Sequence, residues 1–272
     1  MSPNASAVPA SSEPIVIESN ADLVAQASSN AWPGNGTVSN PYIIANMSFT
    51  GFSDMAMWID RVDLHLVIQD CSFTDCDISV EIDMSRNVTF ARNTIYGGYE
   101  GMVIFGAAGG IIVSNNTIDE AHYGMYLCET DNIVVCNNTI SNAEDYNILL
   151  EGSDGNTIIG NDIINSDWCG ICLAYSNDNI ISDNTVTDAS VGIFLAYLSY
   201  RNTITGNTVL DCDPDEGGVV IVDTVDDNTV SDNTVTFADG ESKDDSDLII
   251  MVAAVLIIAM FAMVLVASRK KD

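Results

Sequence analysis

The sequence has very little positive charge. Lysine and arginine together number 8, against 39 aspartate and glutamate residues, so the formal net charge of the 272-residue chain is −31. Three of the eight basic residues, Arg269, Lys270 and Lys271, belong to the last four positions. Because nucleic-acid binding requires a basic surface that contacts phosphates, we expect no nucleic-acid partner. An acidic surface of this kind is typical of a well-hydrated protein exposed to salt.

The usual ligands of transition metals are also scarce. The sequence contains only two histidines, His65 and His122, which are far apart, and it has no cluster of methionine and histidine suited to copper. Seven cysteines are present, but the close pair Cys169 and Cys172 belongs to an extended segment rather than to a helix start, where reactive thiols are common. We therefore expect mostly free thiols and no cofactor, with Ca²⁺ as the one candidate ion.

The main feature of the sequence is a repeat. The pattern Asn-x-Ile-x-x-Asn-x-Ile recurs at intervals of 22 to 26 residues. Its second Asn, here called the anchor, gives nine aligned positions: Met47, Cys71, Asn93, Asn116, Asn138, Asn161, Asn184, Asn207 and Asn233. The residues three before and two after each anchor are apolar, and most are β-branched or aromatic, which favours strands. A third short strand follows each pair, as in Gly170-Ile-Cys-Leu.

A unit of three short strands cannot bury its apolar face alone, so it must stack on its neighbours. The repeat therefore predicts an all-β fold, a right-handed single-stranded parallel β-helix of about nine coils with a period of about 23 residues. A leucine-rich repeat is disfavoured because leucine is scarce and no segment has helical periodicity. We expect the anchors to adopt left-handed backbone conformations and to bond one another as an internal ladder through Asn93, Asn116, Asn138, Asn161, Asn184, Asn207 and Asn233.

These units, together with Gly-Asn-Gly-Thr at 34–37 and Asn-Pro-Tyr-Ile-Ile at 40–44, resemble the NosD-type right-handed parallel β-helix repeats of the pectin-lyase-like class. The resemblance covers roughly residues 14 to 240 and implies the fold. Such repeats are common in archaeal and bacterial envelope proteins. Because many unrelated activities use this scaffold, the resemblance implies little about activity. NosD proteins are linked to copper delivery for nitrous oxide reductase, which makes a copper-maturation accessory one alternative.

The remaining segments predict a membrane anchor. Residues 248–267 carry no charge, and 20 helical residues span about 30 Å, the thickness of the hydrocarbon layer. The basic tail that follows predicts a cytoplasmic C-terminus and an extracellular rod. No signal peptide precedes the rod, and we expect that it is missing from this sequence. The expected segments are a flexible lead (1–13), an N-terminal cap with a helix from Ser19 and a loop into the first coil (14–41), the β-helix (42–238), an acidic linker (239–247), the transmembrane helix (248–268) and the cytoplasmic tail (269–272).

Alternate residues of the third strand should point outward, and in the pectin-lyase-like class this face commonly holds the polysaccharide. Aromatic rings stack on sugar faces and carboxylates accept hydrogen bonds from sugar hydroxyls. A face simply covered by loops, or one that self-associates, is the alternative. The candidate ligand-binding residues are Trp58, Asp60, Glu81, Asp83, Tyr126, Glu151, Tyr175 and Tyr197.

Asp60, Glu81 and Asp83 should form an acidic cluster, with Asp60 and Asp83 about 5 Å apart. That spacing fits a retaining pair of carboxylates, a Ca²⁺ site, or simple ion pairs with Arg61 and Arg86. The catalytic motifs of polygalacturonases and mannuronan epimerases are missing, so we assign no catalytic residue. The leading hypothesis is a non-catalytic, membrane-anchored surface protein that binds glycans or contributes to the envelope. The alternatives are a polysaccharide lyase, hydrolase or epimerase that uses the acidic cluster, and the copper accessory.

Overall fold

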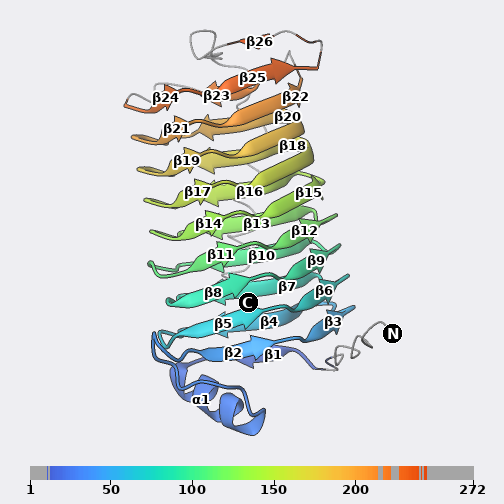
Figure 1. The fold of residues 1–272 in the computed structure, drawn as a ribbon, viewed down its shortest axis with the longest axis vertical. Coiled ribbons are helices and arrows are strands. Elements are labelled where there is room, and N and C mark those ends of the chain that lie inside the picture. Colours follow the sequence, from blue (N-terminus) through green and yellow to red (C-terminus); the bar gives the residue numbers. More distant parts are fainter. Residues whose placement is uncertain are drawn as a thin grey trace, which may run out of the picture.

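The chain forms a rod of stacked coils, a parallel β-solenoid of the right-handed type (Figure 1). The structure, a computed structural model, describes residues 11, 13–213, 217–221, 227–238, 240 and 242–243. Within this part of the chain there is a single helix, and all strand pairings are parallel except the last, between β25 and β26 (Ser242–Lys243). The all-β fold class predicted from the repeat is therefore confirmed.

One side of the rod is a nine-stranded sheet that takes one strand from each coil, and eight parallel pairings connect the first strand to the last. The nine anchors thus correspond to nine strands and about eight complete turns. This sheet consists of β2 (Tyr42–Ala45), β5 (Leu66–Gln69), β8 (Val88–Ala91), β11 (Ile112–Ser114), β14 (Val134–Cys136), β17 (Thr157–Ile159), β19 (Ile180–Ser182), β21 (Thr203–Thr205) and β24 (Thr229–Ser231).

The second and third strands of each coil belong to one 17-stranded sheet, because in two coils they fuse into the long strands β18 (Asp162–Ala174) and β20 (Thr185–Ala196). The other second strands are β3 (Ser48–Thr50), β6 (Ser72–Thr74), β9 (Thr94–Tyr96), β12 (Thr117–Asp119), β15 (Thr139–Ala143), β22 (Thr208–Cys212) and β25 (Thr234–Phe237). The other third strands are β4 (Met55–Asp60), β7 (Ile78–Asp83), β10 (Glu100–Phe105), β13 (Tyr123–Cys128), β16 (Tyr146–Glu151) and β23 (Val219–Ile221).

The core is a set of apolar columns that run along the rod axis. The two apolar positions that flank each anchor point inward, so that Ile158, Ile181 and Ile204 stack as one column and are fully buried. In the second column, two residues after the anchors, the N-terminal members are aromatic, and the rings of Phe49 and Phe73 stack 4.9 Å apart. Each repeat is therefore buried only by its neighbours, which is why the chain needs consecutive coils to form a core.

The anchor asparagines form a continuous buried ladder. Each one from Asn93 to Asn207 donates its side-chain N–H to Oδ1 of the anchor in the next coil. The expected left-handed conformation of the anchors is wrong, because it belongs to the residue before each anchor. Arg92, Asn115 and Asn137 have φ values of 56°, 56° and 54°. That residue makes the corner, which leaves the anchor free to point its amide inward.

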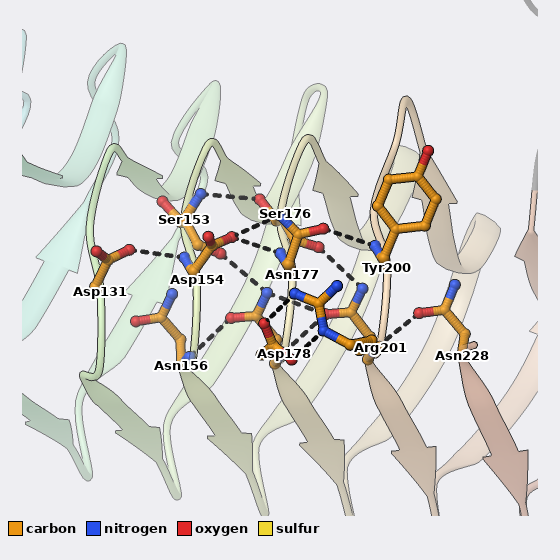
Figure 2. Close-up of polar contacts among 12 residues, drawn as sticks. Asp131, Ser153, Asp154, Asn156, Ser176, Asn177, Asp178, Tyr200, Arg201 and Asn228 are labelled. Carbon is orange, nitrogen blue, oxygen red and sulfur yellow. Dashed lines mark hydrogen bonds and ion pairs between the residues drawn. The ribbon is translucent and has the colours of Figure 1, made fainter. Parts of the chain in front are cut away.

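Two further ladders run along the opposite end of the nine-stranded sheet (Figure 2). Asn156, Asn179 and Asn202 each donate the backbone N–H to Oδ1 of the asparagine one coil later, at 2.7–2.8 Å. Beside them, the backbone N–H groups of Ser153 and Ser176 donate to the hydroxyl oxygen of the next serine in the stack. The sequence analysis did not identify these ladders, although the first Asn of the repeat pattern marks one of them.

The N-terminal end is closed by β1 (Ile15–Ile17) and α1 (Asn20–Ser29). β1 pairs with β4, and α1 lies across the first coil (Figure 1). The helix begins after Ser19, whose hydroxyl accepts a hydrogen bond from the backbone N–H of Asp22. Leu23 and Ala27 are buried against the end of the core. The cap keeps the apolar interior of the first coil out of water.

The predicted transmembrane helix, residues 248–268, and the cytoplasmic tail lie outside the described residues, as do most positions of the flexible lead and of the acidic linker. Within the described part of the chain, no helix has both the length and the apolar character needed to cross a bilayer.

Candidate functional site

The structure brings several predicted site residues into contact on the third-strand side of the rod. Trp58 lies on β4, and its Nε1–H donates to Oδ2 of Asp83 on β7 at 2.9 Å. The hydroxyl group of Tyr126 on β13 donates a hydrogen bond to the carboxylate of Glu151 on β16. Tyr175 and Tyr197, which follow β18 and β20, stack with their ring centroids 5.4 Å apart. These residues form three separate pairs along the rod.

The acidic cluster has the predicted register but little solvent access. Asp60 pairs with Asp83 across neighbouring strands, and Trp58 pairs with Glu81. Asp60 is 2% exposed and Asp83 is 9% exposed, whereas Glu81 is half-buried. Arg61 pairs with Asp60 at 2.6 Å, as one of the three alternatives predicted. Arg86 instead contacts Asp63, at 4.0 Å, and so contributes nothing to the cluster.

The middle of the third-strand face is not the open surface that the alternation predicts. Its outward positions belong to an apolar cluster, here called the outer cluster, whose members include Leu149, Cys172, Phe194 and Val220, all buried. Partly buried aromatic rings pack against it: Tyr123, Tyr126, Trp168 and Tyr197. These outward-pointing side chains are buried because equivalent large apolar residues stack in register and the rings pack against them.

An aromatic strip lies along that edge, at the start of the third strands of four successive coils. It consists of Tyr99, His122, Tyr123, Tyr146 and Trp168. The Tyr99 ring stacks on the His122 ring at 4.6 Å, the Tyr123 ring stacks on Tyr146 at 5.7 Å, and Trp168 meets Tyr146 edge-on at 4.8 Å. Tyr146 is nearly buried, and the other four rings are half-buried. The strip therefore forms a row of mutually packed, partly accessible rings about 15 Å long, given the spacing of parallel strands.

Two exposed carboxylates border the strip and hold His122. Its Nδ1 lies 3.0 Å from Oε2 of Glu144, and its Nε2 lies 3.3 Å from Oδ2 of Asp145. The side chains of Glu144 and Asp145 are 74% and 42% exposed, so both retain oxygen atoms that face solvent. Burial, and then the nearby Asp145 and Tyr99, raise the pKa of Tyr123 above its usual range.

Neither a role for His122 nor the strip was predicted from the sequence. The rings lie six to eight residues after their anchors, because the turn between the second and third strands varies in length. The coils can instead be aligned on a residue near the start of the third strand. Each ring then lies one or two positions before that residue: Tyr99 before Gly101, Tyr123 before Gly124, Tyr146 before Asn147 and Trp168 before Gly170. That alternative alignment is the signal that could have found them.

The described residues do not fit a resident copper ion. Nowhere among them do three His, Cys, Asp or Glu side chains converge as a metal site requires. The two nitrogens of His122 point to different carboxylates, and six of the seven cysteines are buried, only Cys136 being partly accessible. Burial raises the pKa of Cys212 to about 12, so its thiol stays protonated and is a poor ligand. Met57, Met102 and Met125 lie in the core.

Comparisons with known proteins agree with this architecture. The sequence model of a family described as "Periplasmic copper-binding protein (NosD)" matches residues 30–211 and 82–244. A search of curated proteins found no significant match.

Similar solved structures include two mutants of the periplasmic alginate epimerase AlgG. One has a TM-score of 0.58 at 14% identity, over 70% of this chain and 68% of that chain. The other has a TM-score of 0.53 at 13% identity, over 70% of this chain and 59% of that chain. Tailspike protein 3 of bacteriophage CBA120 aligns with a TM-score of 0.50 at 13% identity, over 80% of this chain and 39% of that chain. At these identities the similarity establishes the fold alone.

Proposed function

The chain belongs to the NosD family, and within that family we propose that it is a non-catalytic surface protein that binds glycans along the third-strand side of its β-helix. The observation that carries the proposal is the aromatic strip. Half-buried rings at the spacing of successive coils, bordered by exposed carboxylates, suit a saccharide chain, whose C–H groups pack on the exposed parts of the rings while its hydroxyls donate to carboxylate oxygens. Trp58 with Asp83 offers a second, smaller contact of the same kind.

Charge restricts the glycan class. Each of the four described arginines faces an aspartate: Arg61 with Asp60, Arg86 with Asp63, Arg92 with Asp70, and Arg201 with Asp178. Acidic polysaccharides would therefore meet a surface with a large negative potential and no uncommitted arginine among the described residues. We propose a neutral or amine-bearing glycan as the ligand. Alginate, the polyanionic substrate of the AlgG epimerases, is a poor fit to this surface.

A second candidate, a polysaccharide-processing enzyme, draws on one observation. The Oδ1 atom of Asp60 is buried and has no hydrogen-bond partner, which is compatible with a carboxyl group that contacts a substrate. Two contacts argue against an enzyme. Arg61 forms an ion pair with Oδ2 of Asp60, and Oδ2 of Asp83 accepts a hydrogen bond from Trp58. Both carboxylates thus already have cationic or N–H partners, which favours a structural role over bond cleavage.

We further propose that residues 248–268 anchor the protein in the cell membrane with the rod outside, because the basic residues follow the apolar stretch. The family description is periplasmic, which agrees with a rod on the outer side of that membrane. In this arrangement the C-terminal coils lie near the bilayer and the first three coils lie farthest from it.

The test of glycan binding is a glycan array probed with the full chain in detergent, followed by calorimetry on any positive ligand. The proposal expects neutral or amine-bearing glycans among the positives. Reducing-end release assays on the same glycans, with and without Ca²⁺, decide between binding and cleavage. Release of reducing ends that Asp60→Asn abolishes would replace the proposal with the enzyme.

A further inference from the structure

The outer face of the nine-stranded sheet is uncharged in a strongly acidic protein. Two residues of each strand point outward, which gives 18 positions, and none of them is Asp, Glu, Lys or Arg. Two of the exposed large apolar side chains of the described chain, Ile112 (41%) and Ile180 (44%), lie on this face. The neighbouring corners do carry charge, as in the pairs Arg92–Asp70 and Arg201–Asp178. An uncharged stripe therefore runs the length of the rod between charged borders.

The two outward columns differ in height. The first contains only β-branched residues: Ile43, Val67, Thr89, Ile112, Val134, Thr157, Ile180, Thr203 and Thr229. Six of the nine residues in the second are Ala, Ser or Cys: Ala45, Ala91, Ser114, Cys136, Ser182 and Ser231. No register shift occurs in the eight pairings of this sheet. Because β-branched side chains are stiff at χ1, the first column forms a fixed ridge beside a shallow groove.

We infer that this face is the contact surface between two copies of the chain, packed side by side with their rod axes parallel. A twofold axis parallel to the rods places the ridge of one copy opposite the groove of the other, coil by coil, so that the face is complementary to itself. The antiparallel arrangement would place ridge against ridge. Sheets packed face to face are about 10 Å apart, a gap that side chains of these sizes fill.

Electrostatics selects the same surface. Two copies that each carry a net charge of −31 repel one another, so close approach is cheapest where carboxylates are absent. The face also lacks the aromatic rings that carry sugar binding, which separates it from the aromatic strip. The dimer is independent of the glycan proposal, because the aromatic strip belongs to the other sheet and faces away from this interface.

The area indicates a weak dimer. Nine strands at the parallel spacing give a length of about 40 Å, and two columns with their margins give a width of about 10 Å. The resulting area of about 400 Å² per copy is half that of a standard interface, so we expect reversible, concentration-dependent association. Anchoring of both copies in one membrane would raise their effective concentration.

Cys136 provides a natural probe, since it lies on this face and is the only partly accessible cysteine among the described residues. The experiment is cross-linking of the full chain in detergent micelles with a short bismaleimide, over a range of protein concentrations. We expect a dimer band that increases with concentration, and Ile112→Lys/Ile180→Lys should lower its yield about tenfold or more, because lysines would be buried without partners. The matched control is Val24→Lys/Leu198→Lys, which changes two other exposed apolar residues and the same charge.

Orientation is tested with Cys136→Ser/Thr205→Cys, which moves the only accessible thiol to a coil near the C-terminal end of the face. Parallel rods bring the two copies of position 205 together, whereas antiparallel rods separate them by most of the rod. Cross-linking of this variant supports the parallel dimer, and its absence alongside a Cys136 dimer overturns the parallel arrangement. No Cys136 dimer at any concentration, or equal yields from the face variant and the control, overturns the interface itself.

Discussion

Oδ1 of Asn184 accepts two hydrogen bonds from Asn161 in the preceding coil, one from the backbone N–H and one from the side-chain Nδ2, both at 2.9 Å. Asn161 in turn accepts the same two bonds from Asn138, and its Nδ2 also donates to the carbonyl oxygen of Val135. One buried side chain therefore satisfies polar groups in three coils. The rod is held together at this corner by amides as well as by apolar contacts.

Replacement of Asn161 by Leu should lower the free energy of unfolding by about 1–3 kcal/mol, because buried donors on Asn138 and the Val135 carbonyl lose their partner. Denaturant unfolding followed by circular dichroism measures the change. Asp162→Leu, which places the same side chain one residue later on the exposed side of the strand, should change stability by no more than about 0.5 kcal/mol. Equal stability of the two variants would show that the ladder does not stabilise the fold.

Trp168→Ala should weaken binding of a glycan found by array about thirtyfold, since loss of a large aromatic side chain in a binding site costs about 2 kcal/mol or more. Trp58→Ala should weaken it less, because the Trp58 indole is already bonded to Asp83. Tyr197→Ala removes a ring outside the strip and serves as the control. Calorimetry with the three variants measures the order. A larger loss with Trp58→Ala would move the site to the acidic cluster at the N-terminal coils.

An epitope inserted in residues 1–13 should be digested when protease is added to intact cells. The reason is the basic tail at 269–271, which favours the cytoplasm and leaves the rest of the chain outside. A cytoplasmic protein monitored in the same samples reports cell integrity. Protection of the epitope until lysis would reverse the proposed orientation.

Stability should decrease as pH rises above about 8.5. Burial raises the pKa values of the Cys71, Cys169 and Cys212 thiols, that of Cys212 to about 12. An unfolded thiol ionises near pH 8.5, so above that value the unfolded chain releases protons that the folded chain keeps, and ionisation favours unfolding. Melting temperatures recorded from pH 7 to 11 measure the effect. Cys212→Ala should have a shallower decline than the wild type, and parallel curves would contradict this assignment.

Purified full-length protein should retain well below one copper ion per chain after incubation with Cu(I) or Cu(II) and gel filtration. The basis is the donor set, since no three His, Cys, Asp or Glu side chains converge within the described residues. Elemental analysis of the protein fraction gives the ratio. Stoichiometric copper that His122→Ala abolishes would instead identify the His122 region as a metal site.

Most of the fold is predictable from the anchors, whereas less of the candidate site is. Ile158, Ile181 and Ile204 occupy one inward column because a residue repeated at a fixed interval must meet its own copy in the next coil. Asp60 and Asp83 are in register for the same reason. The direction that a long side chain takes from its corner does not follow from the period, and Arg86 contacts Asp63 in the preceding coil instead of the cluster.

The sequence by itself determined the solenoid, its coil boundaries and the anchor ladder, because stacking converts a linear period directly into spatial columns. The tertiary structure determined which side chains at the surface lie in contact and which of them are buried. The turns before the third strands differ in length, so only folding aligns Tyr99, Tyr123, Tyr146 and Trp168 in one strip. Outward-facing Leu149 and Phe194 are buried because neighbouring rings pack against them. Burial at a surface depends on contacts between coils and turns, and a period of one coil does not contain that information.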